Sequence, residues 1–272
     1  MSLRSSIVSI VVAGGLLAFT PDNEKLKAET DPLRNLKQSA FKKGEFLRYD
    51  VSYGFFDTAE ATLEIKKTSK KINWRNTMHI VGKGWSKGAL NWFFKVEDRY
   101  ETYIDEEAIL PWKFIRHVRE GGYKLDRNIS FNHYSNKATV FENDKKNYSV
   151  EPNSQDLLSA FYYARTLDLQ SAKTGQEYII NTFFDREMYP LKIKFLGKEE
   201  VKTELGTFNC LKFRPLVEEG RVFKEEEDMT IWISDDANKV PIRVKSDLLV
   251  GSINMDLVEY KNLVGSLNEV DD

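Results

Sequence analysis

One five-residue segment matches the motif that holds the nucleophile of many serine hydrolases. Residues 84–88 (GWSKG) have the pattern G-x-S-x-G, in which a serine sits on a tight turn between a strand and a helix. Asp98 and His133 follow in the chain order of a Ser–Asp–His triad. Hydrolases with this motif alternate parallel strands with helices, and this chain does not. We therefore expect Ser86 to lie in a glycine-permitted turn without a catalytic role.

The other groups that could carry chemistry are scattered. His79, His117 and His133 do not pair with each other or with Cys210, the only cysteine, at metal-ligand spacing. The carboxylates of residues 218–228 stand in polar surroundings, which do not desolvate an acid for catalysis. No phosphate-binding loop, dinucleotide fingerprint or calcium loop is present. The sequence therefore predicts no catalytic residue, no metal and no cofactor.

Aromatic residues gather where the serine motif lies. Trp85, Trp92, Phe93 and Phe94 fall within ten residues, with glycines interspersed. Large apolar rings in such a segment can line or cover a hydrophobic pocket. The alternative is a loop folded down on its own core. We assign these four residues to a ligand-binding site.

One helix is predicted over residues 154–167. Asn153 or Ser154 can cap its first turn, and an apolar stripe follows with a spacing of four residues. The stripe consists of Leu157, Leu158, Phe161 and Tyr162, whereas Gln155 and Arg165 are polar. We expect the stripe to pack against a sheet, and we add Leu157 and Phe161 to the ligand-binding site. A second short helix is predicted over residues 89–94.

Elsewhere apolar and polar residues alternate, as in strands with one face on a core and one in water. The clearest runs are residues 47–53, 61–65, 191–195, 231–233, 240–244 and 253–257. Such alternation is typical of antiparallel sheets. We therefore predict a mainly β protein with a large curved antiparallel sheet, half-barrel-like, and one or two helices against its concave side. One continuous sheet and two adjoining sheets remain alternatives.

The first twenty residues predict export. Arg4 precedes an apolar run, residues 7–17 (IVSIVVAGGLL), and Pro21 opens a polar stretch, which is the order of a secretory signal peptide and too short to span a membrane. We expect a signal peptide (1–20), a polar tether (21–40), a single β-rich domain (41–264) and an acidic tail (265–272). The protein would be periplasmic or secreted, and not membrane-spanning after cleavage.

Four segments together resemble a bacterial exported family, domain of unknown function 3108 (DUF3108). They are residues 44–54 (GEFLRYDVSYG), 96–105 (VEDRYETYID), 155–163 (QDLLSAFYY), and the pair 205–212 (LGTFNCLK) with 232–244 (WISDDANKVPIRV). The resemblance extends over residues 41–262 and brings no catalytic residues with it. The implied shape is similar to the half-barrels of periplasmic lipoprotein carriers, an analogy of fold alone.

Three functions remain open at this point. The first is a non-enzymatic envelope protein that binds an apolar ligand, such as a lipid, or an envelope protein partner. The second is a hydrolase of cell-envelope polymers, and the third is a structural subunit of an envelope assembly. The 272-residue chain has a formal charge of −2 with interleaved lysines and acids, so nucleic acid is not expected as a partner. We favour the first function.

Overall fold

The computed structural model describes residues 33–216, 228–248 and 251–270. The predicted signal peptide and the first part of the predicted tether lie outside these residues. The strands are β1 (Phe46–Tyr53), β2 (Phe56–Ile72), β3 (Arg75–Ser86), β4 (Glu97–Asp105), β5 (Pro111–Glu120), β6 (Tyr123–Asn132), β7 (Lys137–Phe141), β8 (Lys145–Ser149), β9 (Glu177–Phe184), β10 (Glu187–Thr203), β11 (Gly206–Leu216), β12 (Asp228–Ser234), β13 (Pro241–Asp247) and β14 (Ser252–Lys261). The helices are α2 (Leu90–Phe93) and α3 (Leu157–Ala164).

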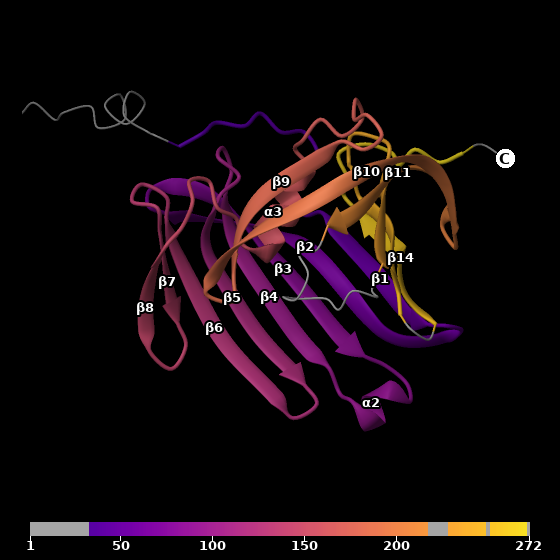
Figure 1. Ribbon diagram of the computed structural model, residues 1–272, viewed down its shortest axis with the longest axis horizontal. Helices are drawn as coiled ribbons and strands as arrows, with labels where there is room; N and C mark the ends of the chain where they lie inside the picture. Colours follow the sequence, from indigo (N-terminus) through magenta and orange to yellow (C-terminus); the bar gives the residue numbers. More distant parts are fainter. Residues whose placement is uncertain (1–32, 217–227, 249–250, 271–272) are drawn as a thin grey trace, which may run out of the picture. The chain divides into compact units, whose positions relative to one another are not determined.

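All of these strands belong to one antiparallel sheet (Figure 1). Its order is β8-β7-β6-β5-β4-β3-β2-β1-β14-β13-β12-β11-β10-β9. Neighbours in the sheet are neighbours in the sequence except at the centre, where β1 pairs with β14 from Phe46–Lys261 to Tyr53–Ile253. The predicted large antiparallel sheet is confirmed. The β1–β14 ladder also decides between the two alternatives, because it joins both halves into one sheet.

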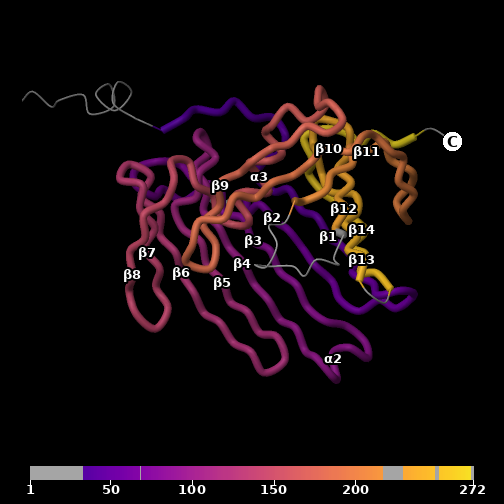
Figure 2. The backbone as a smooth tube through the Cα atoms, in the orientation of Figure 1, coloured from indigo at the N-terminus to yellow at the C-terminus, as the bar shows by residue number. Residues whose placement is uncertain are grey.

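The sheet curls so that its β9–β10 turn returns over β5 and β6 (Figure 2). In that turn, Asp185 Oδ1 accepts hydrogen bonds from Arg116 of β5 at 2.6 Å and from Arg127 of β6 at 2.5 Å. Phe183 of β9 packs edge-on against Phe131 of β6, with ring centroids 6.2 Å apart. No ladder joins the edge strands β8 and β9 in the described part of the chain. These side-chain contacts help to hold the curl, and the sheet is not closed into a barrel.

Burial follows the alternation that predicted the strands. In β5, Trp112, Phe114 and Val118 are buried, whereas Lys113 and His117 between them are not. The same period places Leu47 and Tyr49 of β1 in the central core cluster, because side chains of a strand point alternately to its two faces. The sheet thus has one core-facing side and one side rich in charges.

Helix α3 lies between the two edge strands in sequence and packs on β4 and β9. It begins two or three residues later than predicted, because Asp156 is its cap: the carboxylate accepts from the Ser159 amide at 2.9 Å, and the Ser159 hydroxyl accepts from the Asp156 amide at 2.8 Å. The hydroxyl of Ser154, which we expected to cap, donates instead to the Glu151 carbonyl. The helix also ends three residues before the predicted end.

The buried face of α3 differs from the predicted stripe. Tyr162 is fully buried, as predicted, but Leu157 is 45% exposed. The cap at Asp156 turns Ser159 and Ala160 toward the sheet, and both are buried. The prediction that Leu157 packs on the sheet is therefore wrong, because Ser159, Ala160 and Tyr162 form the buried face of the helix.

Arg165 follows α3 directly and is fully buried against Glu45. Its Nη1 and Nη2 donate to the two oxygens of Glu45 at 2.6 and 2.8 Å, Nε donates to the Asn238 carbonyl at 3.0 Å, and Nη2 also donates to the Ala40 carbonyl at 3.0 Å. Burial alone would lower the pKa of Arg165, but the bonds to Glu45 raise it above its ordinary value. Arg165 is therefore charged and buried, and four hydrogen bonds to Glu45, Ala40 and Asn238 engage its guanidinium.

Segments next to both ends of the described chain also lie on the sheet. Arg34 donates to the carbonyls of Ala108 and Ile109 at 2.8 and 3.0 Å. At the other end, the amide of Val270 donates to the Thr207 carbonyl at 2.8 Å, so the C-terminal segment runs antiparallel beside the first residues of β11. Residues 33–40 of the expected tether and 265–270 of the expected tail thus make specific backbone contacts.

We predict that Arg165→Met lowers the free energy of unfolding by about 3–5 kcal/mol, because it leaves the Glu45 carboxylate buried without its cation. Arg48→Met is the matched control: Arg48 also bonds a glutamate, Glu259, but both side chains are about one-third exposed, so its loss should be under about 1 kcal/mol. Urea unfolding followed by circular dichroism measures both. Equal losses would contradict the central role of the buried pair.

We also predict a pH dependence from Asp156. Burial raises the pKa of Asp156 to about 6, so between about pH 4 and 6 the folded protein binds a proton that the unfolded chain has released. Stability therefore falls as the pH rises through this window and does not change further above it. Asp156→Asn keeps an acceptor for the Ser159 amide but does not titrate. Relative to this variant, the wild type should lose roughly 3 kcal/mol between pH 4 and 7, and a constant difference across that range would contradict the shift.

Candidate functional site

The serine of the G-x-S-x-G segment forms hydrogen bonds within its own loop. Ser86 is the last residue of β3 rather than a turn residue. Its hydroxyl donates to Asn91 Oδ1 at 2.8 Å and accepts from the amide of Val96 at 2.9 Å. Its own amide donates to the Val96 carbonyl at 3.1 Å. Ser86 thus closes the base of the loop that contains α2.

Each of the three histidines has a hydrogen-bond partner other than Ser86. His79 lies 2.6 Å from a carboxylate oxygen of Glu101, and His117 lies 2.6 Å from one of Asp126. His133 Nε2 donates to the Pro111 carbonyl, and burial lowers its pKa. In the part of the chain that the structure describes, no three His, Cys, Asp or Glu side chains gather as metal ligands.

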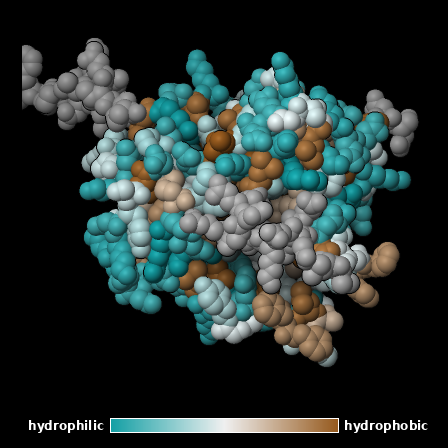
Figure 3. All heavy atoms as spheres, in the orientation of Figure 1, coloured by the Kyte–Doolittle hydropathy of each residue, from teal (hydrophilic) through white to brown (hydrophobic). Residues whose placement is uncertain are grey.

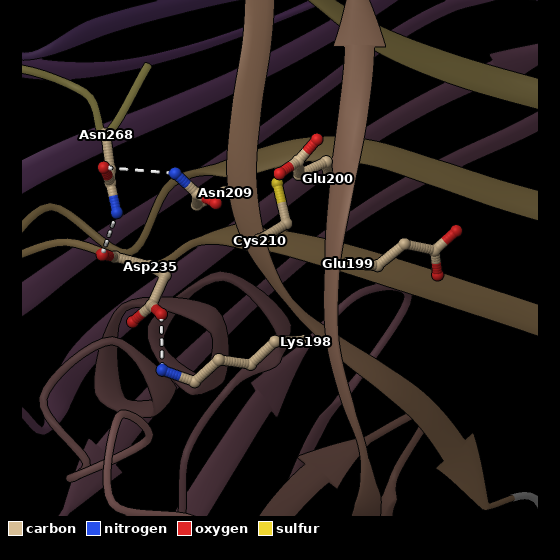
Figure 4. Close-up of a pocket in the computed structure, with 7 residues that line it drawn as sticks. All are labelled: Lys198, Glu199, Glu200, Asn209, Cys210, Asp235 and Asn268. Carbon is tan, nitrogen blue, oxygen red and sulfur yellow. Dashed lines mark hydrogen bonds and ion pairs between the residues drawn. The ribbon is translucent and has the colours of Figure 1, made fainter. Parts of the chain in front are cut away.

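A pocket of about 520 Å³ lies where the C-terminal segment meets β10 and β11 (Figure 4). It is lined by Lys198, Glu199, Glu200, Asn209, Cys210, Asp235 and Asn268. Lys198 is paired with Asp235 at 2.6 Å, and Asn268 donates to the Asp235 carbonyl. Burial raises the pKa of the Cys210 thiol to about 12, so the thiolate that a nucleophile requires is not formed at neutral pH. The residues that line the pocket hold the C-terminal segment against the sheet, and they provide no activated nucleophile for catalysis.

The most unusual surface is a group of exposed apolar side chains at one end of the strands, which we call the aromatic rim. Its residues are Phe55, Phe56, Leu90, Trp92, Phe93 and Phe94. Phe55 is fully exposed, Trp92 is 88% exposed and Phe93 is 86% exposed. Figure 3 shows hydrophobic atoms over α2 and at the β1–β2 tip. Soluble proteins seldom expose several large apolar side chains together unless the surface binds something.

Backbone pairing brings the two parts of the rim together. Phe55 and Phe56 lie at the β1–β2 turn, and α2 follows β3, which pairs with β2. The amide of Lys87 donates to the Thr58 carbonyl at 2.7 Å, so the loop before α2 runs beside the first residues of β2. The turn at Gly88, with φ +54°, then directs the chain into α2.

Three contacts fix the position of α2. Ser86 closes the base of its loop, as described above. The ring of Phe94 lies against Gly121 of the β5–β6 turn, so closely that an added Cβ would be 2.8 Å from a ring carbon. The amide of Gly121 also donates to the Lys95 carbonyl at 2.8 Å. Phe94 therefore anchors α2, while Trp92 and Phe93 point away from the sheet into solvent.

The structure places the predicted ligand-binding residues in three locations. Trp92, Phe93 and Phe94 lie together in the rim. Trp85 is half-buried in β3, between Glu60 and Glu97 in the ladders. Leu157 and Phe161 lie on α3, which packs on β4 and β9, whereas α2 packs on β2. The rings of Phe161 and Tyr162 are 5.0 Å apart, within the core under α3.

The sequence-based prediction missed Phe55 and Phe56. The available signal was a pair of phenylalanines directly after Gly54, between two alternating runs. Apolar pairs at a hairpin turn cannot be buried by the hairpin itself, because the turn projects from the sheet. With β2 and β3 paired as a hairpin, this signal would have predicted that both residues lie beside Trp92 and Phe93.

The sequence profile of "Protein of unknown function (DUF3108)" matches residues 48–258. The chain belongs to the DUF3108 family. No curated protein matches this DUF3108 sequence. The resemblance seen in the sequence is thereby confirmed, and the family description carries no activity.

Solved structures were found that resemble this DUF3108 protein, and one of them shares its fold. A β-barrel-like protein of the domain of unknown function DUF1849 from Brucella abortus has a TM-score of 0.53 and 7% identity, over 85% of this chain and 99% of that one. A hypothetical protein from Chlamydia trachomatis has a TM-score of 0.38 and 9% identity, over 85% and 93%. The first likeness supports the strongly curled sheet. Among the described residues, no helix is both long and apolar enough to cross a bilayer.

We predict that Ser86→Ala loosens the α2 loop. The Val96 amide loses its acceptor, which should cost about 1 kcal/mol, the usual net contribution of one hydrogen bond. Hydrogen exchange should speed up at the Val96 amide and not at the Arg119 amide, which is held by Asp98 at 2.8 Å. Loss of a hydrolytic activity in this variant would instead restore the serine-hydrolase alternative.

Proposed function

We propose that this DUF3108 protein is an exported, non-enzymatic protein of the cell envelope that binds an apolar ligand or surface through the aromatic rim. The observation that carries the proposal is the near-complete exposure of Trp92 and Phe93 in α2. Each such ring presents about 150–250 Å² of surface, and leaving it in water is unfavourable. The proposed export rests on Arg4, the apolar run of residues 7–17 and Pro21.

The proposal places binding at the rim rather than beneath α3. Leu158 lies over Gly82 of β3, where an added Cβ would be 3.4 Å from its Cδ2 atom. Tyr162 is fully buried next to Phe41, with ring centroids 5.0 Å apart. Side chains of α3 therefore contribute to the core, and Leu157 and Phe161 are not needed for the proposed binding.

A hydrolase has less support. Ser86 is engaged by Asn91 and Val96, and each histidine has a partner of its own. An acyl-transfer site needs a nucleophile and a base within hydrogen-bond reach of each other, and these residues do not provide that pair.

We predict that the double variant Trp92→Ser/Phe93→Ser loses whatever the wild type retains when purified from its own envelope. Native mass spectrometry measures the retained lipid or protein directly. Trp74→Ser is the matched control, because Trp74 is 80% exposed but lies in the β2–β3 turn, at the other end of these strands. Both variants should unfold at the wild-type temperature, since the substituted side chains are at least 80% exposed. Retention by the double variant, or equal loss in the control, would contradict the proposal.

A further inference from the structure

The aromatic rim has the form of two projections rather than of a pocket. One projection is the β1–β2 tip with Phe55 and Phe56, and the other is α2 with Trp92 and Phe93. Both extend from the same end of the strands, as Figure 1 shows. A pocket would need side chains that surround the ligand on several sides. Rings on two projecting tips cannot enclose a ligand, but they can insert into an apolar phase.

The charges around the rim balance. Segments 54–58 and 87–97 contain two cationic residues, Lys87 and Lys95, and two acidic ones, Asp57 and Glu97. Lys87 Nζ lies 2.5 Å from Glu60 of β2, and Lys95 Nζ lies 3.0 Å from Glu97. A surface that recognises anionic lipids carries an excess of lysine and arginine. The aromatic rim carries no such excess of positive charge. Its paired charges of both signs complement zwitterionic headgroups, which also carry both signs.

We infer that the aromatic rim docks on the surface of a lipid bilayer with zwitterionic headgroups. The inference rests on the proposed apolar binding and names the surface that is bound. Trp and Phe are among the side chains that partition into the interface between headgroups and acyl chains. Trp92 and Phe93 enter from α2, and Phe55 and Phe56 enter from the β1–β2 tip, with the strands standing away from the bilayer.

The support beneath α2 suits this role. Ser86 and Phe94 fix the loop on the sheet, so Trp92 and Phe93 are held outward before binding. A preorganised tip loses little conformational freedom when it inserts. The two projections are joined through the Lys87–Thr58 hydrogen bond, so one orientation of the protein inserts both.

Flotation with phosphatidylcholine vesicles tests the inference. The wild type, Trp92→Ser/Phe93→Ser, Phe55→Ser/Phe56→Ser and Trp74→Ser would be purified with the same N-terminus, so that any contribution of that end is common to all. The wild type and Trp74→Ser should float with the vesicles. Each ring contributes roughly tenfold in partitioning, so each double variant should bind roughly a hundredfold more weakly. Salt that shortens the Debye length from about 10 to 3 Å should leave wild-type binding unchanged.

Fluorescence locates the inserted residue. Brominated phosphatidylcholine should quench the tryptophan fluorescence of the wild type, and Trp92→Phe should float normally but lose most of that quenching. The inference is overturned if the wild type does not float, if floating requires anionic lipid and low salt, or if the rim is instead buried between two copies of the chain in solution. If the wild type does not float, yet retains a ligand or protein that Trp92→Ser/Phe93→Ser loses in native mass spectrometry, the proposed function stands and the bilayer inference alone fails.

Discussion

The buried ion pair between Glu45 and Arg165 is the interaction on which the rest of the structure depends. Glu45 directly precedes β1 at the centre of the sheet, and Arg165 directly follows α3, which connects the two edges. The same guanidinium binds the carbonyls of Ala40 and Asn238. One side chain therefore joins the N-terminal segment, the central strand, the only helix on the core face of the described chain and the β12–β13 turn. A buried charge of this kind contributes specificity of arrangement, because any other placement of α3 would leave it unpaired.

The sequence predicted what depends on local pattern and could not predict what depends on distant partners. Alternation identified the runs at residues 47–53 and 253–257 as strands, but only the folded chain shows that they pair with each other at the centre. In the sequence, Arg165 could be identified only as a polar residue of the predicted helix, and arginine is mostly exposed in proteins. Its partner lies 120 residues earlier in the sequence, and no local pattern indicates such a pair. The helix start shifted because the cap is Asp156 and not Asn153 or Ser154, the two candidates that the sequence suggested.

The candidate site shows the same division. Trp92, Phe93 and Phe94 could be recognised as a cluster because they are adjacent in sequence, whereas their joining with Phe55 and Phe56 requires the register of β2 and β3. Leu157 was misplaced because a four-residue spacing fits two neighbouring faces of a short helix equally well. The cap at Asp156 selects between these faces, and that choice is made by contacts with Thr102 of β4, which donates to the Asp156 carboxylate at 2.6 Å.

The pairing of β1 with β14 determines the order in which this sheet can be completed. Strands β1 to β8 form a run of hairpins between sequence neighbours, which can assemble as that part of the chain becomes available. The central ladder, by contrast, joins residues such as Arg48 and Glu259, which are 211 positions apart. The strand that is synthesised last among those described occupies the middle of the sheet. Until it arrives, β1 is an open edge with unpaired backbone groups, a form that associates readily with other chains. A cell that produces this protein must therefore keep each unfinished chain apart from its neighbours until β14 is in place.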